Sequence, residues 1–237
     1  MTGNLKDLLR RALHKDILID LEDRGRAEAL KAYEMVRDGS SLDKKRAREL
    51  EGQARFRMME QGFEQVCAMY GGKLLDGGII PKTELKVFQP FMRFDVGGSG
   101  VILGMAAMPD RKTMPGKNKS RLAGVTLNYN LTPRLDFDGT AAKIGDVFVL
   151  FLFSRNRDKS GRIDEIAVGM IDSAYEAFLF YETLDEFLSG HGDVAPPAQR
   201  PAPVAPAAPA IKLKRDAKPF VPPEAPQQGK DQEKGGK

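Results

Sequence analysis

The sequence predicts an α+β protein in which N-terminal helices pack on a largely antiparallel β-sheet, followed by a disordered tail. Three observations support this fold class. Apolar residues recur at helical spacing over the first seventy residues, and short apolar runs separated by turn residues fill the region from 84 to 181. From Val194 onward Pro and Ala dominate, a composition that cannot form a core.

Two helical segments are expected before the strands. The first begins with an apolar stripe at three- and four-residue steps: Leu5, Leu8, Leu9, Ala12, Leu13, Ile17 and Leu21. Residues 26–37 continue in helical composition until a break at residues 39–41. Ser41 is a suitable N-cap for the next helix, with Asp43 in its first turn. That helix should run to Tyr70 and end at the two glycines that follow.

Residues 84–96 and 101–109 are expected to form a hairpin around residues 97–100, which are Gly-Gly-Ser-Gly. Pairing the first and last of these glycines places Val96 opposite Val101 and sets the register of the whole hairpin. Phe94 then faces Leu103, and Met92 faces Met105, so one face of the hairpin is uniformly apolar.

A further strand is expected at residues 122–127, and a three-stranded antiparallel meander at residues 147–153, 163–171 and 178–181. The run at 147–153 is entirely apolar, which is typical of a strand buried on both faces. Thr183 and Glu186 match a capping box, which predicts a short helix ending at Gly190. A competing box begins at Ser173, so residues 178–181 could instead be helical.

We divide the chain into a helical region at 1–71 and a β-rich region at 72–190, packed together as one domain. Residues 191–237 form the predicted disordered tail. Two islets interrupt its Pro/Ala composition, at residues 211–215 starting with Ile211, and at residues 220–223 starting with Phe220. These islets are candidates for contacting a protein partner.

The composition bounds the setting of the protein. Cys67 is the sole cysteine, which excludes an internal disulfide and a Cys-based zinc site, and its place in an apolar helical stripe predicts a core residue. No apolar run approaches the roughly 20 residues that span a bilayer, and no signal-peptide pattern opens the chain. We therefore expect a cytoplasmic protein with no membrane association.

The overall charge does not identify a partner. The chain carries 37 basic and 33 acidic residues, a net charge of +4. Residues 190–237 hold eight of the basic and five of the acidic residues, which leaves 29 and 28 in residues 1–189. The folded part is almost neutral, so only a local patch could attract a polyanion.

Most catalytic and cofactor motifs are absent from the sequence. The only histidines are His14, within the first helix, and His191, at the start of the tail, and neither suggests a nucleophilic triad. No phosphate-binding loop is present, and the calcium-like run that starts at Asn156 has Ala167 where a glutamate is needed. We expect no cofactor and no metal site.

One enzymatic alternative remains, a metal-dependent nuclease in which carboxylates hold the metal and a lysine helps to polarise water. Its candidate residues are Glu84, Lys86 and Asp110. Such spacing is common by chance, and the predicted register places Glu84 and Asp110 on opposite faces of the hairpin. A bulge at Pro90 would be needed to bring them together.

The loop at residues 111–121 is the sequence's best candidate for a binding site, because it holds five basic residues and no acid. These are Arg111, Lys112, Lys117, Lys119 and Arg121. Flexible basic loops frequently contact phosphates. The basic residues in the first half of the second helix alternate with acids, which favours a solvated face.

The function that the sequence favours is a non-catalytic binding or adaptor protein. Its basic loop would contact nucleic acid or another polyanion, and its tail a protein. The metal-dependent nuclease is the alternative.

Overall fold

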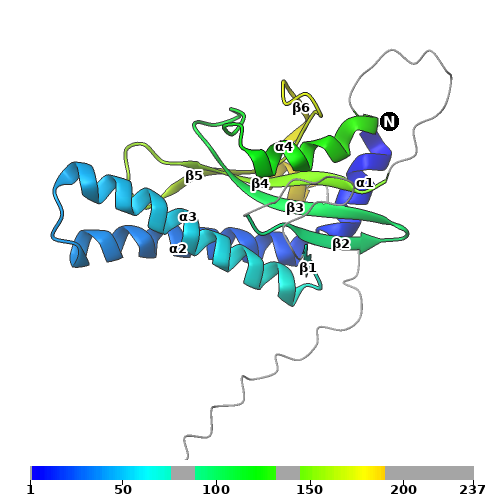
Figure 1. Cartoon of the computed structure of the whole chain (residues 1–237). Coiled ribbons are helices and arrows are strands. Elements are labelled where there is room, and N and C mark those ends of the chain that lie inside the picture. Colours follow the sequence, from blue (N-terminus) through cyan, green and yellow to red (C-terminus); the bar gives the residue numbers. More distant parts are fainter. Residues whose placement is uncertain (1, 76–88, 132–144, 190–237) are drawn as a thin grey trace, which may run out of the picture. The chain divides into compact units, whose positions relative to one another are not determined.

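The computed structural model describes residues 2–75, 89–131 and 145–189. In these residues N-terminal helices pack on a mixed, mostly antiparallel sheet, as predicted (Figure 1). The elements follow in this order: α1 (Thr2–Ala12), α2 (Lys15–Gly39), α3 (Lys44–Met69), β1 (Lys73–Leu74), β2 (Met92–Val96), β3 (Ser99–Met108), α4 (Lys119–Val125), the 3-10 helix η2 (Thr126–Leu131), β4 (Val147–Arg155), β5 (Ile163–Ile171), β6 (Phe178–Thr183) and α5 (Leu184–Ser189).

The helices begin and end close to the predicted positions, with two corrections. The first apolar stripe is divided between α1 and α2, because His14 adopts an extended conformation between them. The N-cap of α3 is Asp43 rather than Ser41, since the Asp43 carboxylate accepts hydrogen bonds from the backbone N–H groups of Lys45 and Arg46. Helices α2 and α3 lie side by side and run in opposite directions (Figure 1).

The strands form one sheet in the order β1–β2–β3–β4–β5–β6. Every neighbouring pair is antiparallel except β3 and β4, which are parallel. Parallel neighbours need a crossover connection, and α4 and η2 lie in that connection.

The strand expected at residues 122–127 is therefore wrong, because these residues lie in α4 and η2. The Asn118 side chain caps the helix by accepting a hydrogen bond of 2.8 Å from the backbone N–H of Arg121. On the buried side Ala123 and Val125 join the core. Because residues 122–127 lack a polar face, their sequence shows no amphipathic pattern at helical spacing.

The hairpin of β2 and β3 is confirmed, but its predicted register is wrong by two residues. Val96 pairs with Ser99, so that Phe94 lies opposite Val101 and Met92 opposite Leu103. The turn is made by Gly97 and Gly98 alone, with φ of 55° and 93°. Two successive positive φ angles are those of a tight two-residue hairpin turn, which only glycine-like residues adopt readily. A shift of two residues preserves the faces, so the predicted apolar face is retained.

The meander of β4, β5 and β6 is confirmed, and residues 178–181 belong to a strand. The capping box also forms: the backbone N–H of Thr183 donates to the Glu186 carboxylate, and that of Glu186 donates to the Thr183 hydroxyl. Helix α5 follows, as the box predicts.

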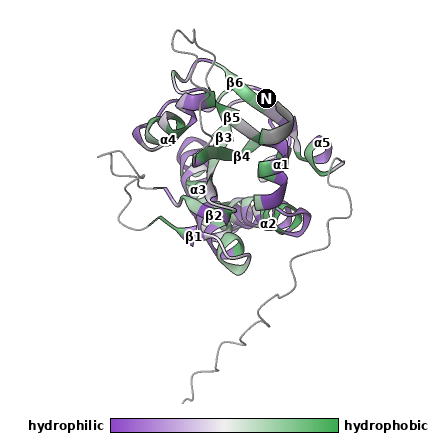
Figure 2. Ribbon diagram, turned by 90° about the vertical axis from the view of Figure 1, so that its right-hand side faces the viewer, coloured by the Kyte–Doolittle hydropathy of each residue, from purple (hydrophilic) through white to green (hydrophobic). Residues whose placement is uncertain are grey.

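Both faces of the sheet are covered, as Figure 2 shows with α1 and α4 on opposite sides of the strands. Helices α1, α2, α3 and α5 bury one face, and α4 buries the other. Glycines allow two helices to approach β4 closely. A Cβ on Gly25 of α2 would lie 2.7 Å from the Phe153 ring, and one on Gly124 of α4 would lie 2.5 Å from the Phe148 ring.

A buried asparagine completes the sheet where the β4–β5 ladder ends. Asn128 is fully buried in η2, and its amide nitrogen donates to the carbonyl oxygens of Phe148 and Ile171, both at 2.9 Å. Its amide oxygen accepts from the Phe148 N–H at 2.9 Å. One side chain thus replaces the interstrand partners that these backbone groups would otherwise lack.

Several predictions concern residues outside the described part of the chain. These are Glu84 and Lys86, the first part of the strand at 84–96, and the tail with its two islets. The predicted domain boundaries stay predictions. Cys67 is buried, as expected. Across residues 2–75, 89–131 and 145–189, no helix combines the length and apolarity that crossing a bilayer requires.

Candidate functional site

The basic loop at 111–121 uses part of its charge within the protein. The Arg111 guanidinium forms a bidentate ion pair with Asp164 on β5, at 2.6 and 2.8 Å. The Arg121 guanidinium folds back onto the carbonyl oxygen of Gly116, at 3.0 Å from its Nε. Two of the five predicted contact residues are therefore committed to holding the loop.

Tyr175 anchors the middle of the same loop. It is buried, and its hydroxyl donates to the carbonyl oxygen of Pro115 at 3.0 Å. The Lys117 ammonium lies 5.6 Å from the centre of its ring, within the range of a cation–π contact. Burial raises the pKa of Tyr175, so its hydroxyl stays a donor at neutral pH. Lys112 and Lys119 are the loop's remaining cations, and neither makes an ion pair with a described residue.

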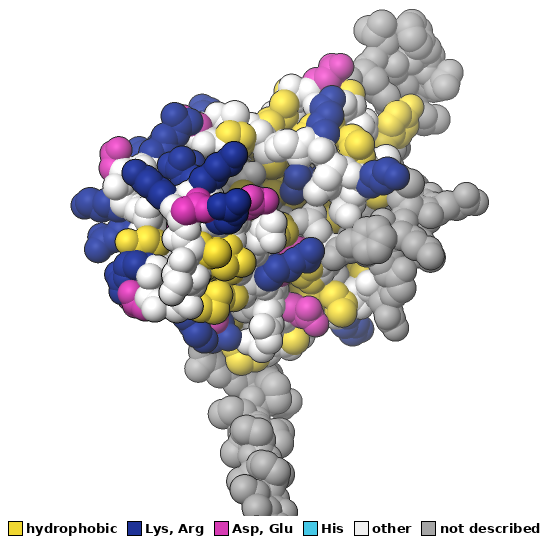
Figure 3. Space-filling view, turned by 60° about the vertical axis from the view of Figure 1, so that its left-hand side comes forward, with side chains coloured by type: hydrophobic (Ala, Val, Ile, Leu, Met, Phe, Trp, Pro, Cys, Tyr) yellow, Lys and Arg dark blue, Asp and Glu magenta, His cyan; other side chains and the backbone are white. Residues whose placement is uncertain are grey.

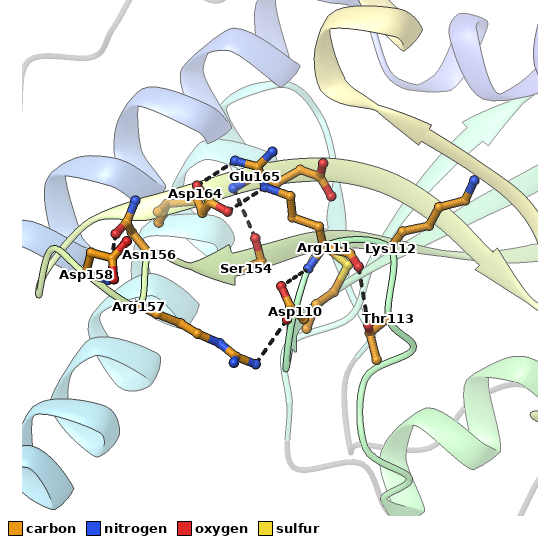
Figure 4. A network of polar contacts seen from close by, with 12 residues as sticks. Asp110, Arg111, Lys112, Thr113, Ser154, Asn156, Arg157, Asp158, Asp164 and Glu165 are labelled. Carbon is orange, nitrogen blue, oxygen red and sulfur yellow. Dashed lines mark hydrogen bonds and ion pairs between the residues drawn. The ribbon is translucent and has the colours of Figure 1, made fainter.

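A polar network joins the start of this loop to the hairpin between β4 and β5 (Figure 4). The Asp110 carboxylate accepts from the backbone N–H of Arg111 at 2.9 Å and pairs with the Arg157 guanidinium at 3.0 Å. Beside it, the Tyr181 hydroxyl donates to Glu165 at 2.5 Å. Burial and this neighbouring carboxylate raise the pKa of Tyr181.

The network bears on the nuclease alternative only through Asp110. That carboxylate is neutralised by Arg157, and the described ranges contain no group of three side chains that could share a metal ion. Glu84 and Lys86 lie outside those ranges, and the nuclease alternative therefore stays a prediction.

A second concentration of positive charge lies where α3 meets the β4–β5 hairpin. We call it the α3–hairpin surface and define it by six side chains: Lys44, Lys45, Arg48, Arg155, Lys159 and Arg162. A groove of about 630 Å³ runs between α2 and α3 at this surface, and Ser160 of the hairpin closes one side of it. The hairpin is held there by Arg26 of α2, which donates to the carbonyl oxygen of Ile163 at 3.0 Å.

Three acidic side chains of the groove region are already paired. Asp38 pairs with Arg37 at 2.6 Å, Asp43 pairs with Arg46, and Glu51 lies 3.4 Å from Arg55. None of the six cations that define the surface makes an ion pair with any residue that the structure describes. The six positive charges also outnumber the two exposed carboxylates nearby, those of Glu49 and Asp158.

Figure 3 brings the tip of the α2–α3 helical pair forward and shows basic side chains gathered over it. The sequence interpretation of α3 as a solvated face of mixed sign did not reveal this excess. Two of the acids at the start of α3, Asp43 and Glu51, are paired locally, whereas the added cations come from a hairpin more than a hundred residues later. The run from Arg155 to Arg162, with four basic residues in eight, was the available signal.

The comparisons with known proteins add no family to this geometry. No protein-family model, no curated protein and no solved structure matches the chain.

Proposed function

We propose that this protein is a non-catalytic binding protein that holds nucleic acid on the α3–hairpin surface. The observation that carries the proposal is a set of six cations that form no ion pair with a described carboxylate. Three of them, Lys44, Lys45 and Arg48, line the groove. The other three, Arg155, Lys159 and Arg162, belong to the neighbouring β4–β5 hairpin. Lys and Arg side chains left free in this way neutralise phosphates and release counterions, which provides affinity without reading the sequence. The predicted loop contributes a weaker, secondary contact through Lys112 and Lys119.

The groove favours a phosphate backbone over a compact anion. The cations of the α3–hairpin surface come from two elements, the first turns of α3 beside the groove and the β4–β5 hairpin, rather than converging on one point. A chain of phosphates can contact such separated charges in succession. Glu51, the partly buried acid that lines the groove, is paired with Arg55 and so offsets little of this positive charge.

The direct test compares two triple variants in equilibrium binding to fluorescent single-stranded DNA, duplex DNA and RNA at low salt. The first carries Lys44→Ala, Lys45→Ala and Arg48→Ala, and should weaken binding by about tenfold or more because three phosphate contacts are lost. The matched control removes the same charge from the loop, with Lys112→Ala, Lys117→Ala and Lys119→Ala, and should bind more tightly than the first variant.

Two results would count against the proposal. If the unmodified protein binds none of the three polymers at low salt, nucleic acid is not its ligand. If the loop variant loses more affinity than the α3 variant, the binding site is the loop at 111–121. Incubation of each complex with magnesium or manganese checks the nuclease alternative, since the proposal expects the nucleic acid to remain intact.

A further inference from the structure

Next to the groove, a separate cavity of about 120 Å³ opens between α3 and the ends of β3, β4 and β5. Its floor is apolar and includes Phe56, Met59, Met105, Met108, Phe153 and Ile163. For comparison, an engineered apolar cavity of about 150 Å³ in another protein stays dry and binds benzene. This cavity therefore has room for an apolar group of about that size.

Three arginines border the cavity, and they carry more positive charge than the nearby acid can balance. Arg55 is largely buried, with 19% of its side chain exposed, and its nearest carboxylate is Glu51 at 3.4 Å. Arg155 and Arg162 are exposed and make no ion pair with any described residue. Burial, together with the positive charge of Arg155, lowers the pKa of Arg55 from its ordinary value. An anion at this border would offset both effects.

Gly52 provides independent support for an open site. It lines the cavity from the middle of α3, and a Cβ added there would meet no atom within 4 Å. Glycine is a poor helix former, and close packing does not require it at this position. Its presence keeps the border of the cavity clear.

We propose that the cavity binds a small organic monocarboxylate, with its apolar body against Phe56 and Met59 and its carboxylate on Arg55. The guanidinium group suits a carboxylate, because its planar donors match the two oxygens. Arg155 and Arg162 add charge at the entrance. The cavity is separate from the groove, although Arg155 and Arg162 also belong to the α3–hairpin surface. The proposal does not depend on nucleic-acid binding, because Arg55 and the apolar floor carry it.

The test measures benzoate binding to the full chain by calorimetry and by saturation-transfer NMR, with benzamide as the uncharged control. Benzoate should bind, and benzamide should bind at least about tenfold more weakly because it lacks the charge that Arg55 recognises. Arg55→Gln should raise the benzoate Kd by about tenfold or more for the same reason. Glu51→Gln should tighten binding, since it removes the carboxylate that competes for Arg55.

Gly52→Leu should abolish binding by filling the cavity border, while Gly52→Ala, which adds a single methyl group, should retain it. Gly52→Ala should raise the melting temperature, because alanine is the better helix former and its Cβ meets no atom within 4 Å. The melting temperature of Gly52→Leu shows whether that variant is folded. Three results would overturn the proposal: no benzoate binding at millimolar concentration, equal affinity for benzamide, or unchanged benzoate affinity in both Arg55→Gln and Gly52→Leu. If Gly52→Leu does not fold, the other two variants decide the question. Arg55→Gln should weaken benzoate binding and Glu51→Gln should strengthen it, and any other outcome contradicts the proposal.

Discussion

Asn128 shows how a single polar side chain can hold two strands in register. It satisfies three backbone groups of Phe148 and Ile171 inside the core, where water cannot replace it. Replacing it with alanine would leave those groups without partners at a cost of about 3 kcal/mol in the free energy of unfolding. Urea denaturation of Asn128→Ala measures this loss.

The exposed Gln61 of α3 provides the control for that experiment. Gln61→Ala should change the free energy of unfolding by no more than about 0.5 kcal/mol, as surface substitutions usually do. Similar values for the two variants would contradict the role given to Asn128.

Asp146 illustrates a partly buried ion pair that makes stability depend on pH. The Arg93 guanidinium donates to its two oxygens at 2.9 and 3.0 Å, which holds the pKa of that carboxyl below its usual range. A lowered pKa means that the folded state favours the charged form. The ion pair therefore contributes to the free energy of unfolding at pH values above the unfolded pKa of about 3.9. This contribution is lost as the pH falls through the pKa of Asp146 in the folded state.

Asp146→Asn should accordingly cost about 1.5 kcal/mol at neutral pH. The difference between variant and parent should shrink as the pH falls below about 4, because the parent carboxyl then becomes neutral too. Chemical denaturation at pH 7 and at successively lower pH checks this. A difference that is the same at every pH would contradict the ion-pair explanation.

Two single residues explain why the sequence overestimates how much of the basic loop's charge can contact a ligand. The partner of Arg111 lies 53 residues away, and the tyrosine that holds Pro115 lies 60 residues away. Charge counts within a segment cannot reveal neutralisation across such separations. The same limit concealed the α3–hairpin surface, whose two halves are joined only by folding.

The β2–β3 hairpin is the element in which local chemistry determines register. Gly97 and Gly98 both occupy the left-handed region, so the turn has two residues and Val96 pairs with Ser99. The sequence Gly-Gly-Ser-Gly permits a two-residue turn at 97–98 or at 98–99. Moving the turn by one residue shifts the strand pairing by two and keeps the same faces. Alternation alone could not choose between them, which is why the faces were predicted correctly and the register was not.

Substitutions in that turn should differ according to what each position tolerates. Gly98→Val should destabilise the protein by about 1 to 2 kcal/mol, because a β-branched residue resists positive φ. Gly97→Asn should be nearly neutral, since asparagine followed by glycine suits this turn. Thermal denaturation of the two variants tests the assignment. Equal melting temperatures would contradict it.

The connection between β3 and β4 shows the opposite case, in which long-range packing overrides local pattern. Residues 122–127 are mostly apolar and were expected to form a strand, yet they form the crossover whose α4 packs on Phe148 of β4. The helix is short, and its cap Asn118 is a signal visible in the sequence but too brief to identify a helix. The parallel pairing of β3 with β4 depends on this crossover.

For the whole molecule, the sequence predicted the fold class because its strongest signals are long. The apolar stripe of the first helices and the unbroken run at the start of β4 identify a helical layer and a buried central strand. The α3–hairpin surface was not predicted, because the sequence indicated the loop at 111–121 as the basic binding site. Its location depends on how α3, the hairpin and their acidic partners meet in three dimensions.

We propose above that nucleic acid binds the α3–hairpin surface through its phosphates. The salt dependence of the dissociation constant tests this most directly, because each phosphate contact on duplex DNA contributes about 0.9 to the slope of log K against log salt. The parent should show a strong slope, and the variant with Lys44, Lys45 and Arg48 replaced by alanine should lose about 2 to 3 from it. An unchanged slope in that variant, with a reduced slope in the matched loop variant, would contradict the claim.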